Sequence, residues 1–352
     1  MQTHRPTRIL ELDALRGLAA LAVVLFHYTT RYEQLFGHAE PLAVSVPWGH
    51  YGVDLFFMLS GFVILMTLER TADSWRFAWG RFSRLYPAYW AAAALTFLVV
   101  SLGRLPGQEV SWSDALLNLT MVQALLGAEH IDGAYWSLQA ELIFYANMLV
   151  LFRCGAFRRP TLAVALWLAA AVAVQLAQAP AATFWPGASE LLSKLATLAS
   201  LKYIPLFAIG ILFYASRQSG WSPASVATIA ASLATVGWFD GLASAAVDAA
   251  LAAALLLAVA GRLPALSSRP LVALGAISYT LYLVHQNIGY VLIREFQLWG
   301  AAPSFAIAAA TFVALTLAWW LHRLVEQPAM KWLRGRDPAY FWRRLRPASA
   351  DA

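Results

Sequence analysis

The stretch Leu12–Tyr28, LDALRGLAALAVVLFHY, is apolar enough to form a membrane-spanning helix, yet it carries an arginine and a histidine, Arg16 and His27. A helix needs about 20 residues to cross a hydrocarbon core. Arg16 and His27 are eleven residues apart, so they lie on nearly the same helix face, separated by roughly 16 Å along the axis. An ionisable group inside a membrane costs about 3 kcal/mol or more. The pair therefore indicates a function.

The rest of the chain is as apolar as this stretch. Hydrophobic residues make up 60% of the sequence and charged residues 12%, which is typical of a polytopic membrane protein. We expect an all-α integral membrane helix bundle of about ten transmembrane helices, forming one domain over 1–352 with a core at about 12–325 and a basic tail at 326–352. The predicted spans are 12–31, 50–68, 86–102, 134–152, 161–179, 197–215, 222–239, 243–260, 271–292 and 304–325. Two of them, 161–179 and 243–260, are rich in alanine and read as scaffold or lipid-facing helices.

The basic residues alternate with the predicted spans. Most arginines fall in one set of loops and in the two ends of the chain, which places both termini in the cytoplasm. The net charge of +6 is therefore a topology signal, and we expect no nucleic-acid partner. The single cysteine, Cys154, excludes an internal disulfide framework and a thiolate metal cluster, so no metal is expected.

Four ionisable residues fall at a similar depth in the outer part of the membrane. They are His27, Asp54, Glu141 and His285. A shared level suggests a shared polar cavity. The alternative is that each is merely satisfied by a neighbour or lies in the interface, an alternative with more weight for Asp54 and His285 than for the other two.

A basic group is predicted at the cytoplasmic boundary. Arg81 and Arg84 lie about one turn apart at the start of the third span, and Arg16 lies near the same level. Arginines there can simply satisfy topology. As a functional group, paired guanidiniums would make forked contacts to phosphate. A donor with a phosphorylated head and a long arm, such as a coenzyme A thioester, would fit the roughly 16 Å between this group and His27.

Six stretches of the sequence resemble the acyltransferase 3 family of membrane O-acyltransferases, in the family's order. They are LDALRGLAALAVVLFHY (12–28), YGVDLFFMLSGFVILM (51–66), RFSRLYPAYW (81–90), YWSLQAELIFY (135–145), LGAISYTLYLVHQ (274–286) and LVEQPAMKWL (324–333).

The resemblance implies transfer of an acyl group, most commonly acetyl, from cytoplasmic acyl-CoA to a hydroxyl of a carbohydrate or glycolipid at the bacterial cytoplasmic membrane. Ser60 and Gly61 fall in a family signature and are expected to serve close helix packing. Many relatives carry an acidic residue and a glutamine where this chain has Leu142 and Ile143, which weakens any transfer of acceptor identity. We expect a stand-alone enzyme without a fused extracytoplasmic domain.

The predicted roles follow from the residues and the resemblance together. His27 and Glu141 are the catalytic candidates, with His27 either the general base, oriented by Glu141, or the nucleophile that carries the acyl group. A flippase or transporter of a lipid-linked sugar or small solute is the alternative. The sequence leaves the oligomeric state open, and membrane lipid is an expected partner. Donor binding is predicted for Arg16, Arg81 and Arg84, and acceptor binding for Asp54, Trp136, Ser137 and His285.

Overall fold

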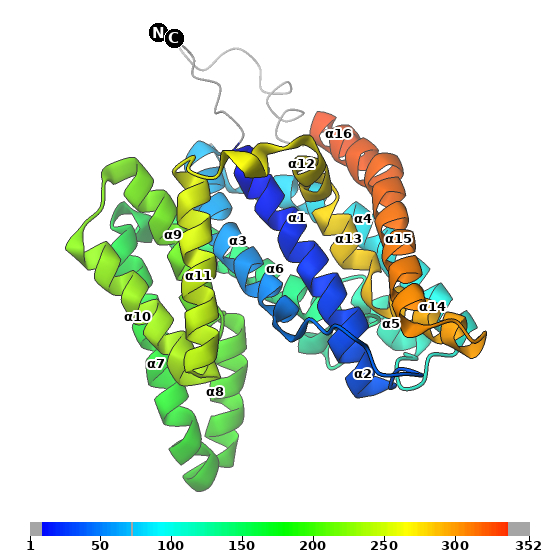
Figure 1. Ribbon diagram of the computed structural model, residues 1–352. Coiled ribbons are helices and arrows are strands. Elements are labelled where there is room, and N and C mark those ends of the chain that lie inside the picture. Colours follow the sequence, from blue (N-terminus) through cyan, green and yellow to red (C-terminus); the bar gives the residue numbers. More distant parts are fainter. Residues whose placement is uncertain (1–8, 72, 337–352) are drawn as a thin grey trace. The chain divides into compact units, whose positions relative to one another are not determined.

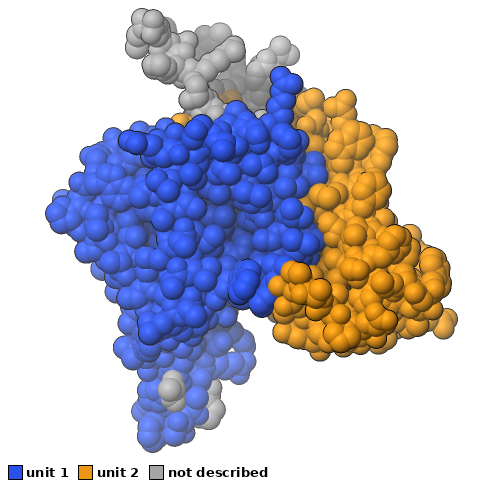
Figure 2. All heavy atoms as spheres, in the orientation of Figure 1, with its two compact units in different colours: residues 1–27, 46–66, 136–278 blue, residues 28–45, 67–135, 279–352 orange. Residues whose placement is uncertain are grey.

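The computed structural model describes residues 9–71 and 73–336, and all regular structure in these ranges is helical (Figure 1). The prediction of an all-α protein is confirmed. The described chain forms two compact units (Figure 2): unit 1 comprises residues 1–27, 46–66 and 136–278, and unit 2 comprises residues 28–45, 67–135 and 279–352. The single membrane domain over 1–352 stays a prediction. The predicted basic tail begins as a helix, and its arginines beyond residue 336 lie outside the described residues.

Unit 1 is built around two close helix pairs. In one pair, Gly17 faces Gly275, and a Cβ added at Gly275 would overlap the backbone of Asp13. In the other, a Cβ at Gly61 would overlap the carbonyl of Phe207. Small residues allow such backbone approach between apolar helices, so the packing role expected for Gly61 is confirmed. The helices of this unit are α1 (Leu10–Leu25), most of α3 (Gly52–Arg70), α6 (Trp136–Arg153), α7 (Pro160–Phe184), α8 (Pro186–Leu198), α9 (Ile204–Ser219), α10 (Pro223–Asp240), α11 (Leu242–Val259) and α12 (Arg269–Ala276), with the 3₁₀ turn η2 (Pro47–Tyr51).

Unit 2 packs a long helix against the C-terminal part of the chain. In the short helix Ser278–Val284, Tyr279 donates a hydrogen bond to the carbonyl of Leu85 at 2.8 Å, and Thr280 donates to the carbonyl of Ala318 at 2.8 Å. These bonds tie helix backbones together across the unit. Its helices are α2 (Tyr32–Leu35), α4 (Ser74–Gly103), α5 (Trp112–Asn118), α13 (Ser278–Val284), α14 (Gln286–Leu298), α15 (Pro303–Leu321) and α16 (Gln327–Gly335).

Two segments have π-helical geometry, which adds a residue to the turn. They are η1 (Phe26–Arg31), directly after α1, and η7 (His322–Glu326), between α15 and α16. Such turns are rare and often occur at functional sites. Each contains a histidine.

Five helical segments among the described residues are long and apolar enough to cross a membrane: 47–70, 74–103, 160–184, 242–259 and 303–335. The count of ten spans is not confirmed. One reason is that the predicted span 271–292 is divided into α12, α13 and α14, with breaks at Ile277 and His285. The loop between α4 and α6 forms the short helix α5 and two 3₁₀ turns, Gln123–Leu126 and Gly133–Tyr135.

Candidate functional site

The ring of His27 is oriented by its own helix. It lies in the π-helical turn η1, half-buried, with Nδ1 2.9 Å from the carbonyl oxygen of Val23. A carbonyl oxygen can only accept, so Nδ1 carries the hydrogen and Nε2 has the lone pair of the neutral ring. The ring of Phe26 packs against His27 at 5.1 Å and against the exposed His50 at 5.3 Å. The bond to Val23 thus fixes the orientation of the ring and makes Nε2 its basic nitrogen in the neutral form.

Glu141 is held by two hydroxyl groups. Ser60 of α3 donates a short hydrogen bond to its Oε1, and Tyr145, one turn further along α6, donates to the same oxygen at 2.6 Å. Both donors are neutral, so the carboxylate is fixed in position without a counter-charge from either. Ser60 thus binds the predicted catalytic carboxylate, while its neighbour Gly61 serves packing.

Asp54, another acidic residue of unit 1, lies within electrostatic reach of other charged residues. The charged residues that act on Asp54 are Asp248, Asp240 and Lys202. Asp248 is 1% exposed, and its Oδ1 has no hydrogen-bond partner among the described residues. Sequence reasoning missed Asp248, because its alanine-rich helix reads as scaffold. A single acid inside such a helix was the available signal.

The remaining acceptor candidates in unit 1 lie at the start of α6. Trp136 is 39% exposed and its ring packs against those of Phe57 and Tyr203, with centroids 6.1 and 5.4 Å away. Ser137 is buried. An indole with an exposed edge can stack on a sugar ring.

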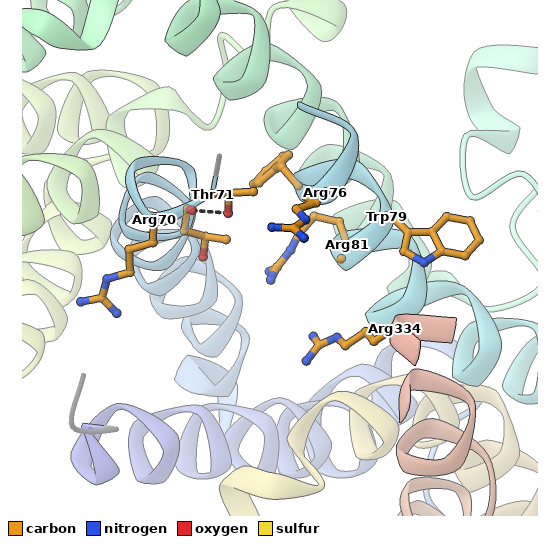
Figure 3. A pocket seen from close by; sticks show the side chains of 9 residues that line it. Arg70, Thr71, Arg76, Trp79, Arg81 and Arg334 are labelled. Carbon is orange, nitrogen blue, oxygen red and sulfur yellow. Dashed lines mark hydrogen bonds between the residues drawn. The ribbon is translucent and has the colours of Figure 1, made fainter. Parts of the chain in front are cut away.

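Unit 2 contains a basic cavity of about 400 Å³ where α3 ends, α4 begins and α16 ends (Figure 3). Arg81, which the sequence predicts to bind phosphate, lines it. Arg70, Arg76 and Arg334 also line it and were read from the sequence only as topology charges. None of the described lining residues is acidic. The lining residues are Thr67, Arg70, Thr71, Arg76, Phe77, Trp79, Gly80, Arg81 and Arg334.

Arg84 has a different environment from Arg81. It donates to Oε1 of Glu326 at 2.9 Å, and His322 in η7 contacts the other carboxylate oxygen at 2.7 Å. Gln327 bonds the second ring nitrogen of His322 at 2.9 Å. Glu326 is 1% exposed, so its carboxylate is buried between the guanidinium of Arg84 and the Nδ1–H of His322. The pair Arg81 and Arg84 thus divides between a cavity and an ion pair, and donor binding by Arg84 stays a prediction.

Two further predicted residues lie apart from these groups. Arg16 is half-buried in α1 of unit 1, and its donor role stays a prediction. His285 is fully buried in unit 2, at the break between α13 and α14, with Nδ1 2.8 Å from the carbonyl of Tyr282. The buried Asp132 nearby accepts hydrogen bonds from the backbone of Ala134 and Asn287. Of the four ionisable residues predicted at one membrane depth, His285 lies in unit 2 and the other three lie in unit 1. Their shared depth stays a prediction.

Comparison with known proteins identifies the chemistry. A family model described as an acyltransferase domain matches residues 9–323. Acyltransferase MdmB of Streptomyces mycarofaciens is 29% identical, over 95% of both chains. A putative acetyltransferase, ORF330 of Acidianus two-tailed virus, is 30% identical over 48% of this chain and 47% of its own. The exopolysaccharide production protein ExoZ of Rhizobium meliloti is 29% identical over 32% and 37%, respectively. No solved structure matches significantly.

The family match covers His27, Glu141 and Arg81, the residues that the geometry singles out. An oriented imidazole, a fixed carboxylate and a basic cavity are the groups that acyl transfer from an anionic donor needs. The chain belongs to the acyltransferase 3 family and is an O-acyltransferase with membrane-spanning helices.

Proposed function

We propose that the protein transfers an acyl group, in the first instance acetyl, from cytoplasmic acyl-CoA to a hydroxyl of a carbohydrate or glycolipid. The carbon–sulfur bond of the thioester breaks and a carbon–oxygen bond to the acceptor forms. The acceptor hydroxyl loses its proton, and the coenzyme leaves as the thiol. The reaction needs a base at the hydroxyl and stabilisation of the developing charge.

The observation that carries this proposal is the orientation of His27. With Nδ1–H bonded to the carbonyl of Val23, the neutral ring has its lone pair on Nε2, the atom that would take a proton or attack a carbonyl. As a base, His27 takes the proton of the acceptor hydroxyl. As a nucleophile, it forms a transient acyl-imidazole and passes the acyl group on to the acceptor.

Glu141 is assigned to charge stabilisation. In either mechanism the imidazole becomes cationic, and a carboxylate held by neutral donors offsets that charge. The bonds from Ser60 and Tyr145 fix its position before the reaction, so no reorganisation is needed when the charge forms.

Donor binding is assigned to Arg81 together with Arg16 and Arg84. The cavity beside Arg81 supports the assignment because the guanidinium-bearing residues Arg70, Arg76 and Arg334 also line it. The salt bridge to Glu326 favours an indirect role for Arg84, in which the pair positions the start of α4.

Acceptor binding is assigned to Asp54, Trp136, Ser137 and His285. Carboxylates and imidazoles bind sugar hydroxyls, and an exposed indole edge stacks on sugar rings. The relative ExoZ is named as an exopolysaccharide production protein, which supports a carbohydrate acceptor. We place the enzyme in the bacterial cytoplasmic membrane with both termini inside, on the distribution of basic residues.

The test compares cells that carry the natural chain, His27→Ala or His50→Ala. His50 packs against the same Phe26 ring from an exposed position, so it controls for loss of a ring at that place. We expect an added acyl mass on surface glycans, glycolipids or secreted metabolites with the natural chain and His50→Ala, and its loss with His27→Ala. Equal acylation with His27→Ala and the natural chain would contradict the proposal.

Two further measurements separate the alternatives. Purified protein given labelled acetyl-CoA without acceptor retains label if His27 is an acyl carrier, and retains none if it is a base. A flippase or transporter of the same acceptor would move it without acyl-CoA, so acceptor movement with no acylation in reconstituted vesicles would favour transport.

A further inference from the structure

Aspartates gather where two helices of unit 1 begin. The hydroxyl of Tyr51, just before α3, lies 3.0 Å from that of Ser244 in α11, and Ser244 donates its own hydrogen to the carbonyl of Asp240 at 2.9 Å. Asp54 follows Tyr51 by three residues. Asp248 follows Ser244 by four, so each carboxyl lies on the same helix face as the bonded hydroxyl, one turn further along. The carboxyls of Asp54, Asp240 and Asp248 therefore lie within electrostatic reach of one another.

This group of aspartates is buried at one end and open at the other. Asp248 is 1% exposed, and its Oδ1 has no hydrogen-bond partner among the described residues. Asp54 is half-buried and Asp240 is exposed. A buried carboxyl oxygen without a donor costs free energy, and like charges beside it add to that cost. A cationic donor that enters from the exposed end would offset both costs.

Three aromatic rings of unit 1 accompany the aspartates. Phe57 follows Asp54 by one turn of α3, and its ring centroid lies 5.0 Å from that of Tyr203 and 6.1 Å from that of Trp136. The ring centroids of Trp136 and Tyr203 are 5.4 Å apart. Asp54 and Asp240 act electrostatically on Tyr203, so the rings and the carboxyls form one group. Ring faces attract cations within about 6 Å, and cages of such rings bind ammonium ligands.

A lysine shows which charge this place attracts. Nζ of Lys202 lies 5.6 Å from the ring centroid of Tyr203. Of the charges that act on Asp54, that of Lys202 is positive and the two others, from aspartates, are negative. The side chain of Lys202 is exposed and has a flexible stem, so the ammonium of a ligand can replace it over the ring.

On the proposed function, in which a carbohydrate or glycolipid is acylated, we propose that the acceptor carries an amino group, and that carboxylates and rings of unit 1 bind its ammonium. Asp54 and Asp248 pair with the charge, and Tyr203 and Trp136 contact the face of the amino sugar. An ammonium held by carboxylates keeps its proton, so its nitrogen has no lone pair and a hydroxyl of the acceptor receives the acyl group. Asp248 thereby becomes a residue that determines acceptor specificity.

The experiment uses the full chain in nanodiscs of zwitterionic lipid and three methyl glycosides that differ at one ring carbon. Methyl glucosaminide has an amine there, protonated in slightly acidic buffer, whereas methyl N-acetylglucosaminide has a neutral amide and methyl glucoside a hydroxyl. Calorimetry measures the affinity for each sugar in the natural chain and in Asp248→Asn, Lys202→Gln and Glu190→Gln. The last variant is the control, because the exposed Glu190 pairs with Lys194 on its own helix at 2.6 Å.

We expect the natural chain and Glu190→Gln to bind methyl glucosaminide about 10-fold to 100-fold more tightly than the two neutral sugars, the range of a charge-assisted hydrogen bond. Asp248→Asn should lose most of this preference by weakening glucosaminide binding alone. Lys202→Gln should strengthen glucosaminide binding by about threefold, because the competing cation over Tyr203 is removed. These opposite changes distinguish ligand contact from misfolding, since a misfolded site would weaken all three sugars.

Several results would overturn the inference. The natural chain could show no preference for the glucosaminide, or Asp248→Asn could weaken all three sugars equally, which would give that residue a structural role. A less stable Lys202→Gln protein with no gain in glucosaminide binding would mean that the lysine only neutralises the aspartates. In cells, an acylated product whose mass spectrum shows no basic nitrogen would overturn this inference and leave the proposed function intact. Equal acylation in His27→Ala cells would instead contradict the proposed function.

Discussion

Unit 1 and unit 2 each contain a histidine that belongs to a π-helical turn and a carboxylate that two side chains bind, but the bonding differs. In unit 1, His27 binds a backbone carbonyl, and Glu141 accepts hydrogen bonds from the hydroxyls of Ser60 and Tyr145. In unit 2, His322 binds the carboxylate of Glu326 directly. Arg84 binds the other oxygen of that carboxylate.

On the proposed function, the difference separates a site for chemistry from a site for stability. Neutral donors fix Glu141 but leave its negative charge to act on another group. The guanidinium of Arg84 offsets the charge of Glu326, which lowers the cost of burying a carboxylate. A π-helical turn suits either kind of site, because its added residue changes the direction of a side chain in an otherwise regular helix.

The sharpest way to break this comparison is to replace each histidine. His27→Ala should lower the rate of acyl transfer by about 10²- to 10⁴-fold, the contribution typical of a general base. His322→Ala removes a partner of Glu326 and should reduce stability while leaving kcat near that of the natural chain. Steady-state kinetics with a radiolabelled donor, alongside thermal unfolding in detergent, measure both. Similar losses of kcat in the two variants would show that the turns do not differ in role.

Replacing each carboxylate should give the next largest effects. Glu326→Ala leaves the guanidinium of Arg84 without its buried partner and should lower the free energy of unfolding by about 3 kcal/mol. Glu141→Gln keeps the shape and an acceptor oxygen, so it should lower kcat with little change in stability. Thermal unfolding and kinetics on both variants provide the test. A stable Glu326→Ala protein, or a fully active Glu141→Gln protein, would contradict the assignment.

Sequence reasoning finds His27 and Glu141 but misses the contacts that distinguish their surroundings from those of His322 and Glu326. His27 and Glu141 are visible because ionisable residues inside apolar runs are rare. The pairing of Arg84 with Glu326 joins positions 242 residues apart in sequence, and no local pattern encodes it. The π-helical turns are equally hidden, since five or six residues are too few to shift a hydrophobic period.

The cavity and the buried Asp248 were missed for a different reason. Arginines at the inner ends of helices have a sufficient explanation in topology, so Arg76 and Arg334 carried no further signal until α16 packed against α4. Asp248 is a single acid in an alanine-rich helix, and its burial depends on which helix face packs inward. All-helical structure follows from composition alone, whereas the number of spans depends on where helices break.

A smaller effect should follow from removing the hydroxyls that hold Glu141. Ser60→Ala and Tyr145→Phe each remove one charge-assisted hydrogen bond, worth about 2 kcal/mol, so each should lower kcat by roughly tenfold or somewhat more. Ser232→Ala is the matched control, because that buried hydroxyl binds the carbonyl of Thr228 within its own helix. Kinetics at saturating donor measure the change. Unchanged kcat in both site variants would mean that Glu141 needs no positioning.

The smallest effect concerns the buried carboxyl of Asp132, which also accepts from neutral donors, the backbone N–H groups of Ala134 and Asn287. Burial raises the pKa of Asp132 to about 7, and the two hydrogen bonds oppose this rise. The acidic groups that sense its charge are tyrosines, Tyr28, Tyr89, Tyr135 and Tyr290, which stay neutral in this range.

Because the pKa of Asp132 is higher in the folded protein than in the unfolded chain, protonation stabilises the fold. This contribution is complete below about pH 4 and is lost as the pH rises to about 7. Between pH 6 and pH 7 the free energy of unfolding should fall by about 1 kcal/mol, and Asp132→Asn should remove that slope while keeping an acceptor oxygen. Unfolding midpoints across this range measure it. An unfolding free energy of Asp132→Asn that depends on pH as steeply as that of the natural chain would contradict this expectation. Neutral donors would then compensate a buried carboxylate in this protein, and the distinction between Glu141 and Glu326 would need another basis.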